Sequence, residues 1–184
     1  MIIDETNMEQ SKETNLNRTR KGIAGSYLPA IISFVLLLGL DQVTKYWITH
    51  NMELSASIPI IKGVFEIHYI QNPGAAWGIL ANQQILFYVI TVFALAVGIW
   101  FYVRCKQSGS FHDLRALVIL ILAGAAGNFI DRLRFRYVID FIYVKLIDFP
   151  VFNIADCYAT IGFLLMAVLV LFKYKEEDFE HFRK

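Results

Sequence analysis

The apolar residues of this chain are collected in four long runs, and this clustering restricts the possible folds more than any other feature. Polar segments separate the runs, and 57% of all residues are hydrophobic. A run of about 20 apolar residues is long enough for a helix to cross the hydrocarbon core of a bilayer. The pattern therefore predicts an all-α membrane protein with four transmembrane helices, at about residues 27–47, 85–103, 117–130 and 154–172.

The polar segments at both ends of the chain predict its orientation. Residues 1–26 form a polar tail that we expect to be flexible, residues 27–172 form one membrane domain, and residues 173–184 form a second tail. Lys and Arg are frequent in both tails and in the link between the second and third spans, and such segments stay in the cytoplasm. Both termini are then cytoplasmic, and residues 51–84 and 131–153 face outward.

The second outward segment also contains bases, which weakens the charge asymmetry. These bases need a function of their own, since acidic residues count for little in the positive-inside rule. They are Arg132, Arg134, Arg136 and Lys145.

The first outward segment predicts a small β-structure between the first and second helices. Short β-branched and aromatic pieces at 58–61 and 64–70 are separated by Gly63 and followed by Asn72-Pro73-Gly74. These are typical of short strands and a turn. The small residues of the stretch 72–78 also suit a backbone that approaches a ligand closely, but on composition alone a plain hairpin turn is the better explanation.

Composition excludes several classes of protein. The net charge is +1 and the bases are spread over several segments, which argues against nucleic-acid binding. Cys105 and Cys157 fall at opposite ends of different spans, so we expect two free thiols. The four histidines show no metal-ligand spacing. We expect neither a metal site nor a cofactor.

Several acids stand at the outer borders of the apolar runs, where an ionised carboxylate is costly to bury. Asp131 follows the third span, Asp140 interrupts an apolar stretch, and Asp156 begins the fourth span. Asp41 lies inside the first span, four residues before Lys45, a spacing that favours an ion pair within a helix. Under the predicted topology all four acids gather on one side of the membrane.

Two explanations of these acids remain open from the residues alone. In the structural one, Asn153 and Asp156 cap the fourth helix and Asp131 pairs with Arg132. In the functional one, two carboxylates share a proton and activate water, as in aspartic proteases. A proton-coupled carrier could use the same acids, but a carrier favours polar groups along a path through the membrane.

Five motifs together make the chain resemble a known family, the lipoprotein signal peptidases, which are the type II signal peptidases of bacteria. The resemblance covers about residues 36–172, and Pro73 departs from the small or hydroxylated residue expected there. In order, the motifs are Asp41-Gln42-Val43-Thr44-Lys45, Asn72-Pro73-Gly74-Ala75-Ala76-Trp77-Gly78, Gly127-Asn128-Phe129-Ile130-Asp131-Arg132, Val138-Ile139-Asp140-Phe141 and Phe152-Asn153-Ile154-Ala155-Asp156.

The resemblance implies a monomeric aspartyl endopeptidase of the bacterial cytoplasmic membrane, with a small extracytoplasmic β-cradle between the first and second helices. It would remove the signal peptide from diacylglyceryl-modified prolipoproteins by cutting before the lipidated cysteine, in contact with membrane lipids. The catalytic pair would be Asp140 and Asp156, near the outer face. Substrate-binding or supporting roles would fall to Asp41, Lys45, Asn72, Gly74, Asn128, Asp131, Arg132, Asn153 and Ala155.

Overall fold

The computed structural model describes residues 5–74, 80, 83–107 and 111–183. Of the motif at 72–78, Asn72, Pro73 and Gly74 are therefore described, whereas the rest lies outside the described residues. The chain forms two compact units, Met1–Ser33 and Phe34–Lys184. All the candidate site residues belong to the second unit.

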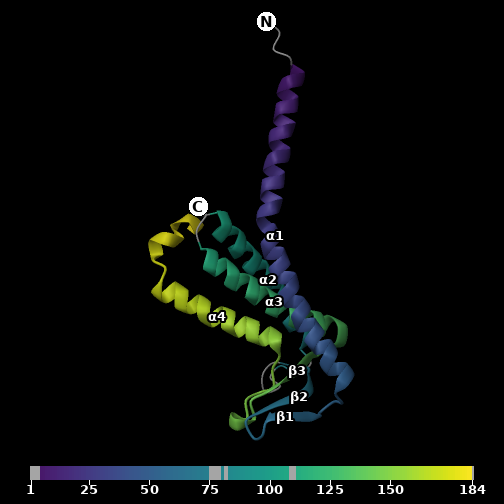
Figure 1. The fold of residues 1–184 in the computed structure, drawn as a ribbon. Helices are drawn as coiled ribbons and strands as arrows, with labels where there is room; N and C mark the ends of the chain where they lie inside the picture. The colour runs from purple at the N-terminus through teal and green to yellow at the C-terminus, as the bar shows by residue number, and fades with distance from the viewer. Residues whose placement is uncertain (1–4, 75–79, 81–82, 108–110, 184) are drawn as a thin grey trace. The chain divides into compact units, whose positions relative to one another are not determined.

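Four long α-helices account for most of the chain (Figure 1). Among the described residues, four helical stretches are long and apolar enough to cross a membrane, which confirms the predicted spans. The flexible tail predicted at the N-terminus differs from the structure, in which the first helix already begins at Glu5. Residues 5–21 contain neither Gly nor Pro to interrupt a helix. The helices are α1 (Glu5–Asn51), α2 (Gln84–Gln107), α3 (His112–Phe135) and α4 (Ile154–Phe172).

The third helix is longer than its apolar run and changes the placement of Asp131. We expected Asp131 just past the end of the span, but α3 continues to Phe135, and Asp131 lies inside it with 1% of its surface exposed. The helix continues because Asp131 is buried against Lys45 at 2.9 Å, an ion pair that compensates its charge.

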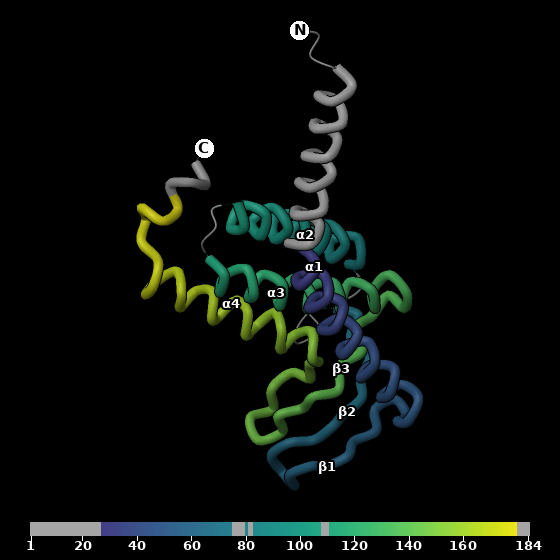
Figure 2. Tube along the Cα trace, turned by 45° about the horizontal axis from the view of Figure 1, so that its top comes forward, coloured from purple at the N-terminus to yellow at the C-terminus, as the bar shows by residue number. Residues whose placement is uncertain are grey.

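A three-stranded antiparallel sheet stands at one end of α3 and α4 (Figures 1 and 2). The strands β1 (Ser57–Ile61) and β2 (Phe65–Asn72) confirm the two predicted from sequence. The third strand, β3 (Val138–Tyr143), follows α3 and pairs with β2, placing Asp140 opposite Ile70. A short 3-10 helix, η2 (Lys145–Ile147), follows it, and another, η3 (Glu176–Arg183), follows α4.

Small residues bring α3 and α4 into close contact. A Cβ atom added at Gly124 would collide with the carbonyl oxygen of Ala155, and one added at Gly127 would collide with the carboxylate of Asp41. Glycine at these two positions therefore allows the start of α4 and the carboxylate from α1 to approach the backbone of α3.

Candidate active site

Asp140 lies on the central part of β3 with only 2% of its surface exposed. The side-chain amide of Asn72 donates a hydrogen bond to its Oδ2 at 2.9 Å, and that of Asn153 donates to its Oδ1 at 2.7 Å. Burial, followed by the negative charge of Asp156, raises the pKa of Asp140 to about 7. Asp140 can therefore hold a proton near neutral pH.

Asp156 occupies the first turn of α4, as predicted. Asn153 is the N-cap residue: its Oδ1 accepts from the backbone N–H of Asp156 at 3.0 Å, and its own N–H donates back to Asp156 Oδ2 at 3.0 Å. This reciprocal pair is a capping box. The capping box holds the carboxylate of Asp156 at the start of α4.

Asn128, on α3, connects the two aspartates to a buried lysine. Its Oδ1 accepts hydrogen bonds from Lys45 Nζ at 2.9 Å and from Asn153 Nδ2 at 3.0 Å. Its Nδ2 donates to Asp156 Oδ1 at 2.7 Å. Because two donors meet its oxygen, the amide must direct its nitrogen towards Asp156.

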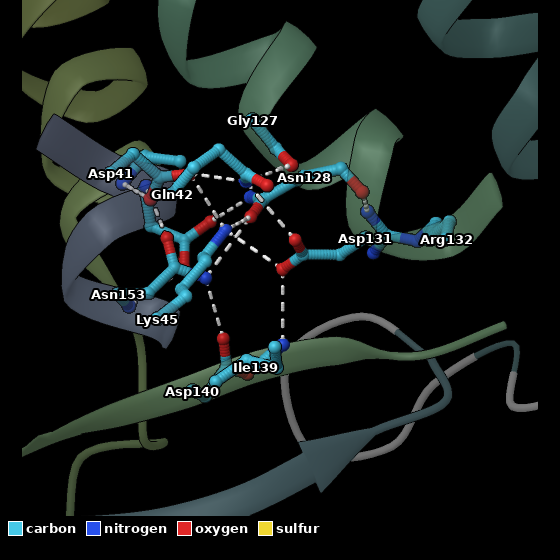
Figure 3. A network of polar contacts seen from close by, with 12 residues as sticks. Asp41, Gln42, Lys45, Gly127, Asn128, Asp131, Arg132, Ile139, Asp140 and Asn153 are labelled. Carbon is cyan, nitrogen blue, oxygen red and sulfur yellow. Dashed lines mark hydrogen bonds and ion pairs between the residues drawn. The ribbon is translucent and has the colours of Figure 1, made fainter. Parts of the chain in front are cut away.

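Lys45 is the central cation of the polar network drawn in Figure 3 and is 1% exposed. Its Nζ lies 3.0 Å from Asp41 Oδ2 and 2.9 Å from Asp131 Oδ2. The ion pair predicted between Asp41 and Lys45 is present. The pairing considered for Asp131 and Arg132 is wrong, since Asp131 pairs with Lys45 from another helix.

The two acids of this network also hold backbone groups next to the candidate catalytic residues. Asp41 Oδ1 accepts a hydrogen bond from the backbone N–H of Ala155 at 3.1 Å. This N–H lies in the first turn of α4, where backbone N–H groups have no partner within the helix. Asp131 Oδ2 accepts from the N–H of Ile139 at 3.2 Å. Each supporting acid therefore fixes the residue that immediately precedes Asp156 or Asp140 in the chain.

Gln42 belongs to the same network and had no role in the sequence prediction. Its Nε2 lies within hydrogen-bond distance of Asp41 Oδ2 at 3.1 Å, Asp131 Oδ1 at 3.1 Å and the carbonyl oxygen of Gly127 at 3.3 Å. Its place beside Asp41, in the first of the five motifs, was the available signal. A neighbour along a helix normally points to another face, so that signal was weak.

Arg132 extends from α3 towards the turn at the end of β2. Its Nη2 donates to the carbonyl oxygen of Gly74 at 3.1 Å, and its guanidinium carbon lies 4.4 Å from the centre of the Phe87 ring. The N–H of Gly74 donates in turn to Asn72 Oδ1 at 3.0 Å. The turn is thereby connected to both Arg132 and, through Asn72, the carboxylate of Asp140.

A pocket of about 520 Å³ is bordered by both candidate catalytic carboxylates. The rest of its wall is formed by the polar residues already described, by the mainly apolar loop after η2 and by the first turns of α4. The loop contributes Phe149, Val151 and Phe152, and α4 contributes Thr160 and Ile161. An apolar wall beside a few convergent polar groups is typical of a substrate site.

The fold and this pocket together define a multi-pass membrane protein with a carboxylate-lined site at one end of its helices. Residues 33–172 match the family model described as signal peptidase (SPase) II. The chain therefore belongs to the signal peptidase II family, a family of membrane-spanning proteases of the bacterial inner membrane, which confirms the resemblance seen in its motifs.

Proteins of known name and structure agree with this assignment. The chain is 42% identical over 149 residues to the lipoprotein signal peptidases of two Streptococcus pyogenes strains, serotypes M5 (Manfredo) and M18 (MGAS8232), covering 81% of this chain and 95% of each relative. A solved bacterial membrane enzyme at 2.3 Å resolution is 37% identical, with a TM-score of 0.73 over 80% of this chain and 92% of that one. A second, at 1.9 Å, is 35% identical, with a TM-score of 0.69 over 80% and 94%.

Proposed function

We propose that this protein is an aspartyl endopeptidase that removes the signal peptide from lipid-modified prolipoproteins by cutting before the lipidated cysteine, with Asp140 and Asp156 as its catalytic pair. The observation that carries the proposal is that Asn153 hydrogen bonds to both carboxylates, which line one pocket. Within the described residues, one chain supplies both carboxylates and the amides that orient them, so the proposed enzyme is a monomer.

The surroundings of the two aspartates support different roles in water activation. Asp156 accepts hydrogen bonds from Asn128 Nδ2 and from the Asn153 N–H, which fix its orientation for a role as proton acceptor. Asp140 is almost fully buried and has a raised pKa of about 7, which favours its protonated form. Asp156 would accept a proton from water while Asp140 donates one to the scissile carbonyl oxygen.

The remaining site residues would hold the substrate or the pair itself. Asn128 and Asn153 orient the carboxylates, and Arg132 beside Gly74 supplies donors for carbonyl oxygens of the substrate. Ala155 is fully buried where α4 meets α3, so it supports the site through packing.

The expected orientation brings the substrate to this pocket. With both termini in the cytoplasm, the sheet end of the helices faces outward, and membrane lipids surround the exposed apolar faces of the four spans. A precursor held by its acyl chains and apolar signal helix is confined to the bilayer, so its cleavage site stays at the depth of the two aspartates.

The test is cleavage of a diacylglyceryl-modified precursor by purified protein in detergent. Asp140→Asn and Asp156→Asn should each lower kcat by about 10²- to 10⁴-fold, because each removes an acid–base group. Mass spectrometry should find the lipidated cysteine at the new N-terminus, and an unlipidated precursor should remain intact.

Asp113→Asn is the matched control, because Asp113 pairs with Lys173 at the opposite end of α3 and does not line the pocket. Its kcat should stay near that of the unchanged protein. Wild-type turnover by either variant of the catalytic pair would refute the assignment, and cleavage elsewhere in the precursor would refute the proposed specificity.

A further inference from the structure

One face of α2 packs against the end of α3 that lies next to the sheet. Gln84, Phe87 and Tyr88 are half-buried, whereas Ile85 and Val89 beside them are 78% and 61% exposed. The spacing i, i+3, i+4 places the three half-buried residues on one helix face. We call these three residues the α2 bracket.

Two residues of the α2 bracket contact Arg132, and the third contacts the backbone at Arg136 and Pro73. Tyr88 donates its hydroxyl hydrogen to the carbonyl oxygen of Arg132 at 3.0 Å. Gln84 Nε2 donates to the carbonyl oxygens of Arg136 at 2.7 Å and Pro73 at 3.1 Å. Phe87 packs its ring against the guanidinium of Arg132, 4.4 Å from ring centre to guanidinium carbon. The bracket thus fixes both the main chain and the side chain of Arg132.

The ring of Phe87 limits how the guanidinium can turn. A guanidinium group prefers to lie over the face of an aromatic ring, and the attraction strengthens where water is excluded. Two of its other contacts are carbonyl oxygens, that of Gly74 at 3.1 Å and that of Asn128 at 3.5 Å. A planar group held by a ring and two acceptors presents its remaining donors in a fixed direction. Arg132 lines the pocket together with Asp140 and Asp156, so a substrate bound there lies beside this guanidinium.

We propose that Phe87 is a positioning residue of the substrate site: its ring holds the guanidinium of Arg132 in the orientation that donates hydrogen bonds to a carbonyl oxygen of the lipid-modified precursor. This inference rests on the proposed function, in which Arg132 contacts the substrate. The proton-transfer chemistry of the two aspartates does not involve Phe87. Its effect is therefore on substrate binding.

The test compares variants of Phe87 by their steady-state kinetics on the lipid-modified precursor. Phe87→Leu keeps an apolar side chain but removes the ring, so KM should rise about five- to tenfold while kcat changes less than twofold. Phe87→Tyr keeps the ring face and should retain the KM of the unchanged protein. Phe93→Leu is the matched control, because Phe93 lies on the same helix with 69% of its side chain exposed, and its KM should not change.

A double-mutant cycle separates positioning of Arg132 from a general packing role. In an Arg132→Ala background, Phe87→Leu should have almost no further effect on KM, because the group it positions is gone. If Arg132→Ala turns over too slowly for kinetics, its Kd for the uncleaved precursor completes the cycle. Additive effects of the two substitutions would overturn the inference, and so would an unchanged KM in Phe87→Leu.

Failure of this inference differs from failure of the proposed function. If Phe87→Leu leaves KM unchanged while Asp140→Asn abolishes cleavage, the positioning role is wrong and the catalytic pair stands. If Asp140→Asn still cleaves, the catalytic assignment is wrong, yet the cycle still reports whether Phe87 acts through Arg132.

Discussion

Replacing Lys45 with Met should destabilise the protein strongly, because this substitution removes the cation that pairs with two buried acids. The Nζ atom lies 3.0 Å from Asp41 and 2.9 Å from Asp131, and both acids are at most 1% exposed. Removing one partner from a buried ion pair typically costs about 3–5 kcal/mol, since the other charge stays in a medium of low dielectric. Lys45→Met leaves two such carboxylates, so we expect a loss in at least this range.

The measurement is equilibrium unfolding in detergent micelles, followed by the fluorescence of the three tryptophans. Lys173→Met is the matched control: Lys173 lies 2.6 Å from Asp113, and the two side chains are 58% and 29% exposed. An ion pair open to solvent on both sides contributes about 0–1 kcal/mol, so the control should unfold almost like the unchanged protein.

A second substitution distinguishes charge from shape in this network. Lys45→Met combined with Asp131→Asn removes one of the two uncompensated charges and should recover part of the lost stability. The electrostatic reasoning fails if Lys45→Met and Lys173→Met cost the same. It also fails if the double variant is less stable than Lys45→Met alone.

Two further predictions concern the proton on Asp140 and the contact between α3 and α4. The pKa of Asp140 is raised to about 7, so between about pH 4 and 7 the folded chain keeps a proton that the unfolded chain has released. The free energy of unfolding should therefore fall as pH rises through this range, by at most about 1.4 kcal/mol per pH unit. Urea unfolding at several pH values should show this slope, and Asp140→Asn should lack it. Gly124→Ala should cost about 1–3 kcal/mol by thermal unfolding, because its Cβ collides with Ala155, whereas Gly39→Ala, with no atom within 4 Å, should not destabilise.

The four helices could be predicted from sequence because a long apolar run has few stable structures in lipid. In lipid, the backbone N–H and C=O groups of a spanning segment must hydrogen bond within the protein, and an α-helix satisfies all of them within the segment itself. The ends of the helices were less predictable. Asp131 ended the predicted third span because a charge there is costly, but α3 continues since Lys45 from α1 compensates that charge. Lys45 lies 86 residues before Asp131 in the chain, and no residue near Asp131 indicates that the two will pair.

The third strand was missed for a related reason. Residues Val138–Phe141 are all buried, so the strand lacks the alternation that identifies a strand with one exposed face. Its partner β2 precedes it by a whole pair of helices. The two strands of the hairpin were predictable because the turn between them is local.

The site itself was predicted as a set of residues but not as an arrangement. Motif order indicated which acids matter, and the structure brings Asp41, Asp131, Asp140 and Asp156 into one network through Lys45, Asn128 and Asn153. The roles of Gln42 and Phe87 depend on contacts between different helices. No spacing along the chain encodes these contacts.

The network also explains why the four acids should respond differently to substitution. Asp41 and Asp131 each pair with Lys45 and hold a backbone N–H of α4 or β3, so their replacement removes compensation for a buried charge and loosens the ends of these elements. Asp140 and Asp156 accept hydrogen bonds mainly from amides, and an Asn side chain keeps the size and one acceptor of Asp. Substitution of the first two should therefore reduce stability and activity together, whereas substitution of the last two should remove activity from a protein that remains folded.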